Sequence, residues 1–441
     1  MQAGEWAKGT PQHPHSAPES AAWPGTAPLG ATGSSFEGTS PEPDLGAGPG
    51  ELAPRENRAT TRPVRAESPS AAKPRRLSLD VVRGMMCVFI LSVDAWYTMP
   101  AWWDHAAWEG VHGQDLVFPF FIAVSGIGLG FASAGGVRLG STLNRFVILV
   151  VLGLLYNLHE SFVVTGQLSV DTLRITGVLQ AFAVVSIVIG LLHYALTTWW
   201  AWCIGTCVMA LIQVTILRVV AEGCADAQLT EQCNPGFPLD RAVFGLAHLY
   251  DQGLGGHDPE GLWAMFGMVI TASVGVTVAH ALGLRPARPF GTRETGRRYV
   301  RALLCLAVFA GLAWAASLVT VTMKRLWTTP FALGTGVALV LLWVILTAVL
   351  DHGRGALILT VLTYPLVALG RNALLVYFGD QVLLRSLTFS YPEGSNTSWA
   401  RTLAYDVGAT DTDPTRFILF MIASWTVLAI FLHRRKLYIR P

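Results

Sequence analysis

The 441-residue sequence is poor in charge. Asp, Glu, Lys and Arg make up 14% of it, against about 25% in soluble domains, and the formal net charge is only +2. A nucleic-acid-binding protein would carry a basic excess, and a disordered protein would lack the 52% of hydrophobic residues found here. The composition excludes both classes, and an ordinary soluble enzyme as well. Fifteen Trp, a residue that favours membrane interfaces, indicate a membrane protein with several spans.

Cysteine is scarce too, with six residues in the chain. Cys224 and Cys233 stand nine residues apart in a segment, 221–260, that we expect outside the cytoplasm, where they could close a disulfide. Cys203 and Cys207 have a spacing compatible with a metal ligand pair, but both fall in an apolar run, where buried packing is the favoured interpretation. No metal site is expected.

Residues 1–72 lack any apolar run long enough to cross a membrane. They hold 11 of the 24 prolines, and the start has no basic stretch followed by an apolar one, so a cleaved signal peptide is not expected. A segment this rich in Pro and Gly cannot bury enough apolar surface to offset its ordering entropy. We predict a disordered cytoplasmic tail over 1–72, acting as a linker or as a regulatory binding segment, and a membrane domain over 73–441.

Apolar runs of about twenty residues recur after residue 72, which is the length of a membrane-spanning helix. We therefore predict an all-α, polytopic membrane protein with about ten transmembrane helices. The expected spans are residues 81–99, 115–134, 144–162, 173–193, 198–220, 261–283, 299–320, 329–350, 358–379 and 415–433.

Basic residues beside the spans predict the orientation, because cytoplasmic loops carry an excess of Lys and Arg. Four basic clusters fall at the same side of a ten-span topology, so both termini are predicted to be cytoplasmic, with the plasma membrane as the expected location. The clusters are Lys73, Arg75, Arg76 and Arg83; Arg138 and Arg145; Arg285, Arg288, Arg293, Arg297, Arg298 and Arg301; and Arg434, Arg435, Lys436 and Arg440.

Ionisable side chains within spans are candidates for function because they are costly in hydrocarbon. Asp80 and Arg83 fit a helix-start pair, whereas Asp94 in the same span has no such explanation. His105 follows in an outward-facing, Trp-rich connection, and Asp94 and Asp115 are near it in sequence. A carboxylate that fixes one ring nitrogen leaves the other free as a base near neutral pH. His105 is therefore a candidate catalytic base, and a solvated loop histidine is the alternative.

Other polar side chains gather near helix ends and in the ninth span. Arg371 and Asn372 stand side by side within that span, so they must face protein or water. They could bind a phosphate or a carbonyl oxygen, or tie two helices together. Arg174, Gln180 and the corner 258–261 add polar groups at other helix ends. The Arg cluster at 285–301 would suit a nucleotide phosphate, although the positive-inside rule accounts for it without a ligand.

Several blocks, in order from about residue 75 to the end, make the sequence recognisable. The most specific block begins at His105 and ends at Pro119, and it includes Asp115. The others are residues 76–84, 173–180, 258–262, 326–328, 370–373 and 434–440. In these blocks the sequence resembles the heparan-alpha-glucosaminide N-acetyltransferase family and its bacterial relatives.

The resemblance implies a transmembrane acyltransferase. It would move acetyl from cytosolic acetyl-CoA to an amine, or a hydroxyl, of an extracytoplasmic sugar or glycan. His105 matches the active-site histidine and would act as a general base or carry the acetyl group itself. Asp94, eleven residues earlier, stands where the best-known member has asparagine. The large lumenal domain of that member has no counterpart ahead of the first predicted helix, so heparan sulfate is not the expected acceptor.

The expected site follows from this resemblance and from the polar residues above. Acetyl-CoA would have its nucleotide at the cytoplasmic mouth, and the further expected partners are a glycan acceptor, membrane lipid and, as an open alternative, a second copy of the chain. The expected catalytic residues are His105, Asp94 and Asp115; the donor-binding residues are Arg83, Arg371, Asn372 and Tyr377; the acceptor-binding residues are Trp108, Glu109, Arg174, Gln180, Asp258 and Glu260. The alternative function is a transporter or flippase of a polar or glycan-linked substrate, in which the same polar residues line a path.

Overall fold

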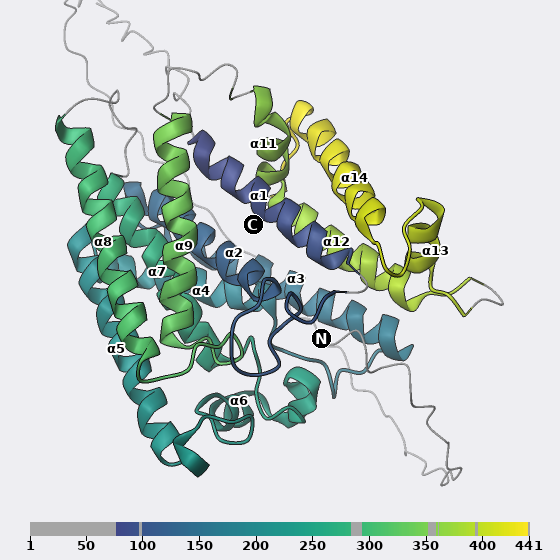
Figure 1. The fold of residues 1–441 in the computed structure, drawn as a ribbon, viewed down its shortest axis with the longest axis horizontal. Coiled ribbons are helices and arrows are strands. Elements are labelled where there is room, and N and C mark those ends of the chain that lie inside the picture. Colours follow the sequence, from purple (N-terminus) through teal and green to yellow (C-terminus); the bar gives the residue numbers. More distant parts are fainter. Residues whose placement is uncertain are drawn as a thin grey trace, which may run out of the picture. The chain divides into compact units, whose positions relative to one another are not determined.

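A computed structural model describes residues 76–96, 99–283, 293–351, 359, 361–392 and 396–439. The tail predicted over 1–72 lies outside these residues, as do Lys73, Arg75, Arg285, Arg288 and Arg440 of the basic clusters. Within the described residues every regular element is a helix, as Figure 1 shows. The all-α prediction is confirmed.

The long helices coincide with the apolar runs of the sequence. Within the described part of the chain, eight segments are long and apolar enough to cross a membrane: Gln114–Ala132 (η1, Gln114–Leu116, with α2, Val117–Ala132), α3 (Leu139–Thr165), α4 (Val178–Ala195), α5 (Trp199–Glu222), α7 (Leu262–Leu282), α8 (Arg293–Ser317), Thr329–Asp351 (α9, Thr329–Leu346, with a π turn, Thr347–Asp351) and α14 (Thr415–Arg434). The protein is thus an integral, multi-pass membrane protein.

Two further predicted spans contain helices that are less apolar. α1 (Leu77–Asp94) carries three charged residues. The ninth predicted span, 358–379, is broken at Asn372 into α11 (Tyr364–Arg371) and α12 (Ala373–Phe389). α12 runs ten residues beyond the predicted end, through polar side chains that find partners on neighbouring helices. The count of ten spans remains a prediction.

Hydrogen bonds between distant segments show which helix ends lie together, and they define two ends of the bundle. At one, which we call the Arg76 end, Arg76 donates a hydrogen bond to the carbonyl of Gly283 at 2.8 Å, and Ser78 donates one to Asp351 at 2.7 Å. At the other, the His105 end, the backbone of Gly110 donates to the carbonyl of Thr322 at 3.0 Å. The described basic residues beside α1, α3, α8 and α14 belong to the Arg76 end, which is the end predicted to be cytoplasmic.

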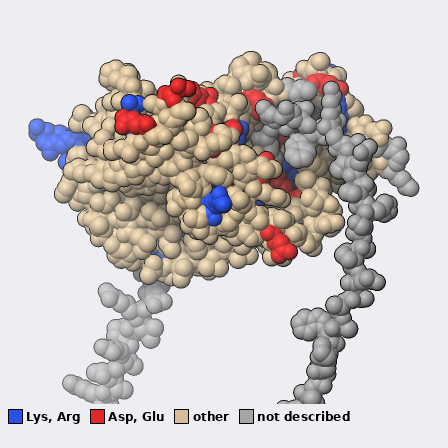
Figure 2. All heavy atoms as spheres, turned by 90° about the horizontal axis from the view of Figure 1, so that it is seen from below, with Lys and Arg blue, Asp and Glu red and all other residues tan. Residues whose placement is uncertain are grey.

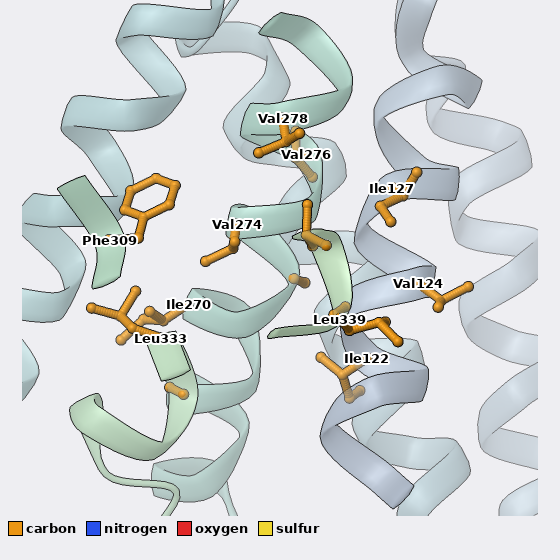
Figure 3. Packing of buried hydrophobic residues seen from close by; sticks show 14 of the residues in the cluster. Ile122, Val124, Ile127, Ile270, Val274, Val276, Val278, Phe309, Leu333 and Leu339 are labelled. Carbon is orange, nitrogen blue, oxygen red and sulfur yellow. The ribbon is translucent and has the colours of Figure 1, made fainter. Parts of the chain in front are cut away.

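The central helix of the bundle is α7. It packs against α2, α4, α5, α8 and α9, and nearly all of its side chains are buried. Figure 3 shows aliphatic side chains of α2, such as Ile122 and Ile127, facing those of α7 and α9. A Cβ on Gly126 would overlap the backbone carbonyl of Ala272, so the α2–α7 approach requires a glycine there.

A second apolar cluster joins α1 to α11, α12 and α14 and includes Leu91, Leu369 and Phe417. Glycine permits its closest helix contact as well: a Cβ on Gly84 would overlap the carbonyl of Leu366, and one on Gly370 would overlap that of Asp80. This contact brings the residues next to the two glycines, on α1 and α11, to the same level of the bundle.

The outward surface of several helices is apolar. Large hydrophobic side chains are exposed along α3, α5, α8 and α14, including Val151, Val208, Leu304 and Val427. Figure 2 shows a face on which uncharged atoms predominate, with Lys, Arg, Asp and Glu in separate small groups. Lipid-facing helices need such a surface, because charge is costly in hydrocarbon.

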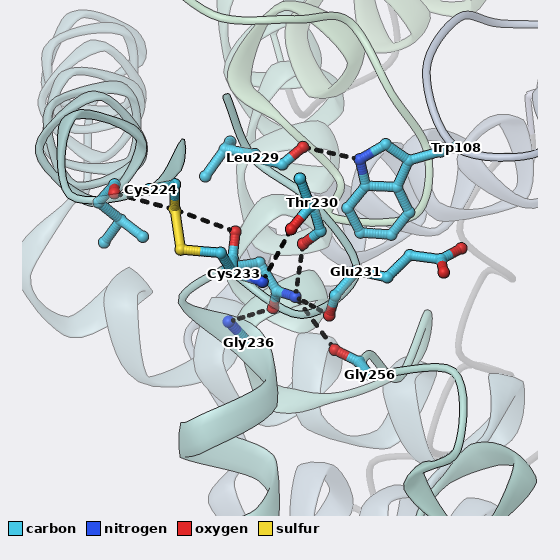
Figure 4. The surroundings of a disulfide bond; sticks show 10 residues. Trp108, Cys224, Leu229, Thr230, Glu231, Cys233, Gly236 and Gly256 are labelled. Carbon is cyan, nitrogen blue, oxygen red and sulfur yellow. Dashed lines mark hydrogen bonds between the residues drawn. A yellow bond between two sulfur atoms is a disulfide. The ribbon is translucent and has the colours of Figure 1, made fainter. Parts of the chain in front are cut away.

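A compact cover follows α5 at the His105 end. It contains the disulfide between Cys224 and Cys233, as the spacing suggested, and the short helix α6 (Gly236–Phe244) (Figure 4). The Asn234 amide donates hydrogen bonds to the carbonyls of three residues, Thr230, Glu231 and Gly256. The indole of Trp108 donates to the carbonyl of Leu229 at 2.9 Å. The cover is thereby attached to the connection that carries His105.

Candidate active site

One cavity of 510 Å³ extends between α1, α2, α3, α4, α11 and α12. At the His105 end its walls include His105, Gln114, Glu260 and Lys324. At the Arg76 end they include Arg83, Arg145, Arg371 and Ile439, and the section between is lined by apolar and aromatic side chains such as Phe118, Phe121, Phe182 and Tyr377. The cavity therefore joins a histidine at one end of the bundle to three guanidinium groups near the other.

His105 is held by a buried carboxylate. Its Nδ1 lies 2.6 Å from Oδ1 of Asp115, which is 1% exposed. The other oxygen of Asp115 accepts hydrogen bonds from the backbone of Ala106 at 3.1 Å and His112 at 3.0 Å. An ionised carboxylate can only accept, so Nδ1 carries the hydrogen and donates it. The Nε2 atom is left as the basic nitrogen of a cavity-lining imidazole.

The imidazole is neutral near pH 7. Burial and the neighbouring ammonium group of Lys324 lower the pKa of His105 to about 4, although Asp115 favours protonation. The Nζ atom of Lys324 lies 3.2 Å from Nδ1, 3.4 Å from Nε2 and 3.7 Å from Oδ1 of Asp115. Our sequence reasoning did not select Lys324. The signal that could have found it is a lysine in a loop that the charge pattern places outside, where basic residues are few.

Asp94 lines the same cavity but has a different partner from the one expected. We expected Asp94 or Asp115 to orient His105, and Asp115 is the one that does. Asp94 instead accepts a hydrogen bond of 2.5 Å from Gln381 on α12. Its carboxyl group also lies against that of Asp380, which accepts a 2.8 Å hydrogen bond from Trp425. A catalytic role for Asp94 remains a prediction.

Three residues expected at the acceptor side form one ion-pair cluster. Arg174 lies 2.7 Å from a carboxylate oxygen of Asp258 and 2.7 Å from one of Glu260. Asp258 also accepts hydrogen bonds from Thr176 at 2.5 Å and from the backbone of Tyr250 at 2.9 Å. Burial opposes ionisation, yet Arg174 and these donors together hold the pKa of Asp258 below its usual value. Of the cluster only Glu260 lines the cavity, so Arg174 and Asp258 position it.

Three other expected acceptor residues lie outside the cavity walls. Gln180 packs between Gly153 and Gly177, where it fills the contact of α3 with α4. Trp108 contacts the ring of His257, with centroids 5.1 Å apart, and Glu109 is exposed. From these positions we predict structural roles for the three residues, because bulky or polar side chains at the ends of spans also serve to join loops and helices.

The expected donor-binding residues also include some that line the cavity and one that does not. Arg83, Arg371 and Tyr377 line the cavity. Asn372 is fully buried at the break between α11 and α12, where its amide donates to the carbonyl of Ala368 at 3.0 Å, and it is not among the lining residues.

Arg145 of α3 joins the guanidinium groups, although the sequence suggested only a loop charge for it. The Nε atoms of Arg145 and Arg371 are both buried without a hydrogen-bond partner. Arg145 and Arg83 are close enough for their charges to repel, and Arg83 has Asp80 at 3.7 Å. Buried donors without partners and like charges side by side both favour the binding of an anion at this place.

Comparison with known proteins gives a consistent result. No family model matches the chain. Its sequence is 23% identical to human heparan-alpha-glucosaminide N-acetyltransferase over 425 residues, which cover 84% of this chain and 60% of the human protein. It is 23% identical to the mouse protein of the same name over 452 residues, 87% of this chain and 65% of the mouse protein. The chain is thus distantly similar in sequence to heparan-alpha-glucosaminide N-acetyltransferase over most of its length. It spans less than two thirds of the length of these relatives.

The geometry explains why one block carries the resemblance to the N-acetyltransferases most specifically. His105 and Asp115 stand near its two ends, and the connection folds so that Gln114 donates its backbone hydrogen to the carbonyl of Trp103 at 3.0 Å. That closure brings the carboxylate within hydrogen-bonding distance of Nδ1. The spacing within the block therefore corresponds to a hydrogen-bonded pair in the fold.

Proposed function

We propose that the protein is a transmembrane acetyltransferase that moves acetyl from cytosolic acetyl-CoA to an amine of an extracytoplasmic sugar or glycan. The observation that carries this proposal is the single cavity that joins Arg83, Arg145 and Arg371 to the His105–Asp115 pair. The names of its relatives, which are N-acetyltransferases, support the same reaction class.

The guanidinium groups suit the charged part of the donor. A CoA nucleotide carries phosphates, and Arg binds phosphate through charge-assisted and often bidentate hydrogen bonds. Arg145 and Arg371 each bring a buried Nε without a partner to this end of the cavity. The aromatic and aliphatic walls between the two ends suit the long, weakly polar pantetheine arm, and its thioester then lies near His105.

The histidine suits the chemistry at the other end. In the proposed reaction Nε2 of His105 removes a proton from the acceptor nitrogen while that nitrogen attacks the thioester carbon. Asp115 holds the ring in the required tautomer and stabilises the imidazolium ion that forms. The low pKa of His105 keeps the ring neutral and ready to accept a proton at physiological pH.

The acceptor side of the cavity carries negative charge. Glu260 lines it, close to Lys324 beside the histidine. Carboxylate groups attract an ammonium ion, so this wall favours an amine acceptor over a neutral hydroxyl. Glu260 is held in place by Arg174, which makes it a fixed rather than a mobile charge.

The test uses the full chain, purified in detergent. Acetyl-CoA and free CoA should each raise the melting temperature, because a ligand that binds the folded state stabilises it by mass action. The protein is then given acetyl-CoA with a radiolabelled acetyl group and glucosamine as the acceptor probe. The assay measures the rate at which labelled N-acetylglucosamine forms. His105→Ala should keep the thermal shift and lose about 10²- to 10⁴-fold in rate, the usual contribution of a general base.

His112→Ala is the matched control, because His112 lies in the same connection and its side chain bonds only the carbonyl of Asp104, at 2.7 Å. Its rate should stay near that of the unmodified protein. Absence of any thermal shift in folded protein would contradict the acetyltransferase proposal and favour a transporter. Full transfer activity in His105→Ala would contradict the role of the histidine.

A further inference from the structure

Among the described residues that line the cavity, Lys324 is the cation at the His105 end, and the mechanism above gives it no role. It lies in the turn between α8 and α9, 219 residues from His105 in sequence. Its ammonium group lies against the imidazole on the cavity wall. A positive charge beside a general base disfavours protonation of that base, so its presence has to be explained by another interaction.

The turn that carries Lys324 is closed by hydrogen bonds and is flanked by buried residues. The backbone of Trp327 donates to the carbonyl of Lys324 at 2.9 Å, and Thr328 bonds back to Met323 through both its backbone and its side chain. Met323, Trp327 and Thr328 are fully buried. Met323 also forms a backbone bridge with Gly110, five residues after His105. These contacts fix the loop of Lys324 relative to the loop of His105, as a preorganised site requires.

The ammonium group does not occupy a lone pair of the ring. Its distances to Nδ1 and Nε2 are nearly equal, 3.2 and 3.4 Å, although the two nitrogens point in different directions. A position in the ring plane at equal distances from both would overlap the carbon between them. The ammonium group therefore lies out of the ring plane and does not point at the lone pair of Nε2.

The ion pair with Asp115 does not explain the presence of a lysine at this position either. Asp115 already accepts three hydrogen bonds of 2.6, 3.0 and 3.1 Å, whereas Nζ of Lys324 is 3.7 Å from its nearer oxygen. An ammonium group has three donors. A distance of 3.7 Å is too long for a hydrogen bond, so this contact satisfies none of them.

We propose that Lys324 is a catalytic residue whose ammonium group donates a hydrogen bond to the thioester carbonyl oxygen of the bound acetyl group and stabilises the negative charge that develops there. This inference rests on the proposed acetyl transfer. As the neutral acceptor amine attacks, a C–N bond forms, the carbonyl π electrons move to oxygen, and Nε2 of His105 takes the amine proton. The C=O bond then re-forms, the C–S bond breaks, and the sulfur takes the electron pair and the proton from His105.

The test compares Lys324→Gln with Arg325→Gln. Arg325 is the adjacent cation on the same turn, and its guanidinium contacts His257 at 3.4 Å, outside the cavity walls. We expect Lys324→Gln to lower kcat about 10²- to 10³-fold, as loss of one oxyanion donor does, and Arg325→Gln to leave it near the wild-type value. The assay measures acetyl transfer to glucosamine at saturating acetyl-CoA, and calorimetry measures the Kd for acetyl-CoA, which should change little in either variant.

A pH profile separates this role from a structural one. The groups that face His105 are Asp104 of its own connection, Asp115 and Lys324, with Glu260 close to the lysine. Loss of the lysine charge makes His105 a stronger base, so the acid limb of kcat/KM, expressed on the concentration of unprotonated glucosamine, should move to higher pH while kcat falls. Lys324→Arg, which keeps a cationic donor, should recover part of kcat.

The outcomes are distinct. A wild-type kcat in Lys324→Gln overturns the assignment of Lys324. Parallel loss of kcat and acetyl-CoA binding in both Lys324→Gln and Lys324→Arg also overturns it, because the lysine would then be needed only for the fold. Absence of acetyl-CoA binding by the wild-type protein overturns the proposed function itself, and the inference with it.

Discussion

The carboxylate of Asp115 accepts a 2.6 Å hydrogen bond from Nδ1 of His105 and is itself almost completely buried. The two residues are ten positions apart, in a connection that is closed by the backbone hydrogen bond from Gln114 to the carbonyl of Trp103. A carboxylate in this position fixes which ring nitrogen is basic. It also supplies the negative charge that compensates a developing imidazolium ion.

Asp115→Asn should test this relationship directly. The amide is isosteric, so the fold should be retained, but an amide can donate to Nδ1 and so favour the tautomer in which Nε2 carries the hydrogen. We expect kcat to fall by up to about 10⁴-fold, as in other His–Asp pairs, with acetyl-CoA binding preserved. Steady-state transfer to glucosamine and calorimetric binding of acetyl-CoA provide the two measurements. Activity near the wild-type value would show that the tautomer is not important.

The pH dependence of the reaction should also be unusual for a histidine base. Burial and Lys324 lower the pKa of His105 to about 4 from an ordinary value of 6.5. The base is active when unprotonated, so activity should persist as the pH falls through 6.5 and be lost only in the more acidic range. The amine of glucosamine itself gains a proton in this range, so kcat/KM has to be expressed on the concentration of unprotonated glucosamine. On that basis its pH profile between pH 5 and 8 should have a flat acid side. A decline centred near pH 6.5 would place His105 in an ordinary aqueous environment instead.

The guanidinium groups at the Arg76 end should determine donor affinity rather than rate. Arg145→Gln and Arg371→Gln each remove a positive charge from the cavity and should raise the Kd for CoA and for acetyl-CoA alike, with kcat little changed. Charge-assisted hydrogen bonds contribute about 1.5 to 3 kcal/mol, so roughly a 10- to 100-fold change is expected for each. Isothermal titration with acetyl-CoA checks this.

Arg138→Gln is the control for charge alone, because Arg138 precedes α3 at the same end and is not among the lining residues. Its Kd should be close to that of the wild-type protein. An equal rise in the Kd for acetyl-CoA in all three variants would mean that donor affinity depends only on the general positive charge of this end.

The fold could be predicted largely from the sequence because apolar runs of membrane length leave few alternatives. The errors occur where polar residues have distant partners. α12 continues to Phe389 because Asp380 bonds Trp425 and Arg385 pairs with Glu160 at 3.0 Å, and hydropathy cannot reveal such pairs.

The sequence could predict those parts of the site whose residues lie close together along the chain. His105 and Asp115 share one short connection, so Asp115 was one of the two carboxylates expected to hold the imidazole, and it is the one that bonds Nδ1. Lys324 and Arg145 were missed because α9 and α3 bring them to the cavity from remote parts of the chain, and each one alone has an ordinary explanation as a loop charge. Gln180 and Asn372 were selected because they are polar within spans, yet Gln180 is used in helix packing and Asn372 lies at a helix break.

Asp240 of the cover should make stability depend on pH. One of its oxygens accepts a 2.7 Å hydrogen bond from the backbone of Leu262 at the start of α7, and the other is buried without a partner. Burial, with a further contribution from Asp258, raises the pKa of Asp240 from 3.8 to about 7. Between these values the folded protein holds a proton that the unfolded chain has lost. Stability therefore falls as the pH rises through this window and levels off above it.

Asp240→Asn removes the titration and keeps an acceptor for Leu262. The difference in melting temperature, wild type minus Asp240→Asn, should thus increase as the pH is lowered from 8 to 5, whereas each protein alone also reflects its other titrating groups. Each pKa unit corresponds to about 1.4 kcal/mol, so the change should be measurable by thermal unfolding in detergent. A difference that stays constant over this range would mean that Asp240 is ionised in the folded protein, with the start of α7 stabilising its charge.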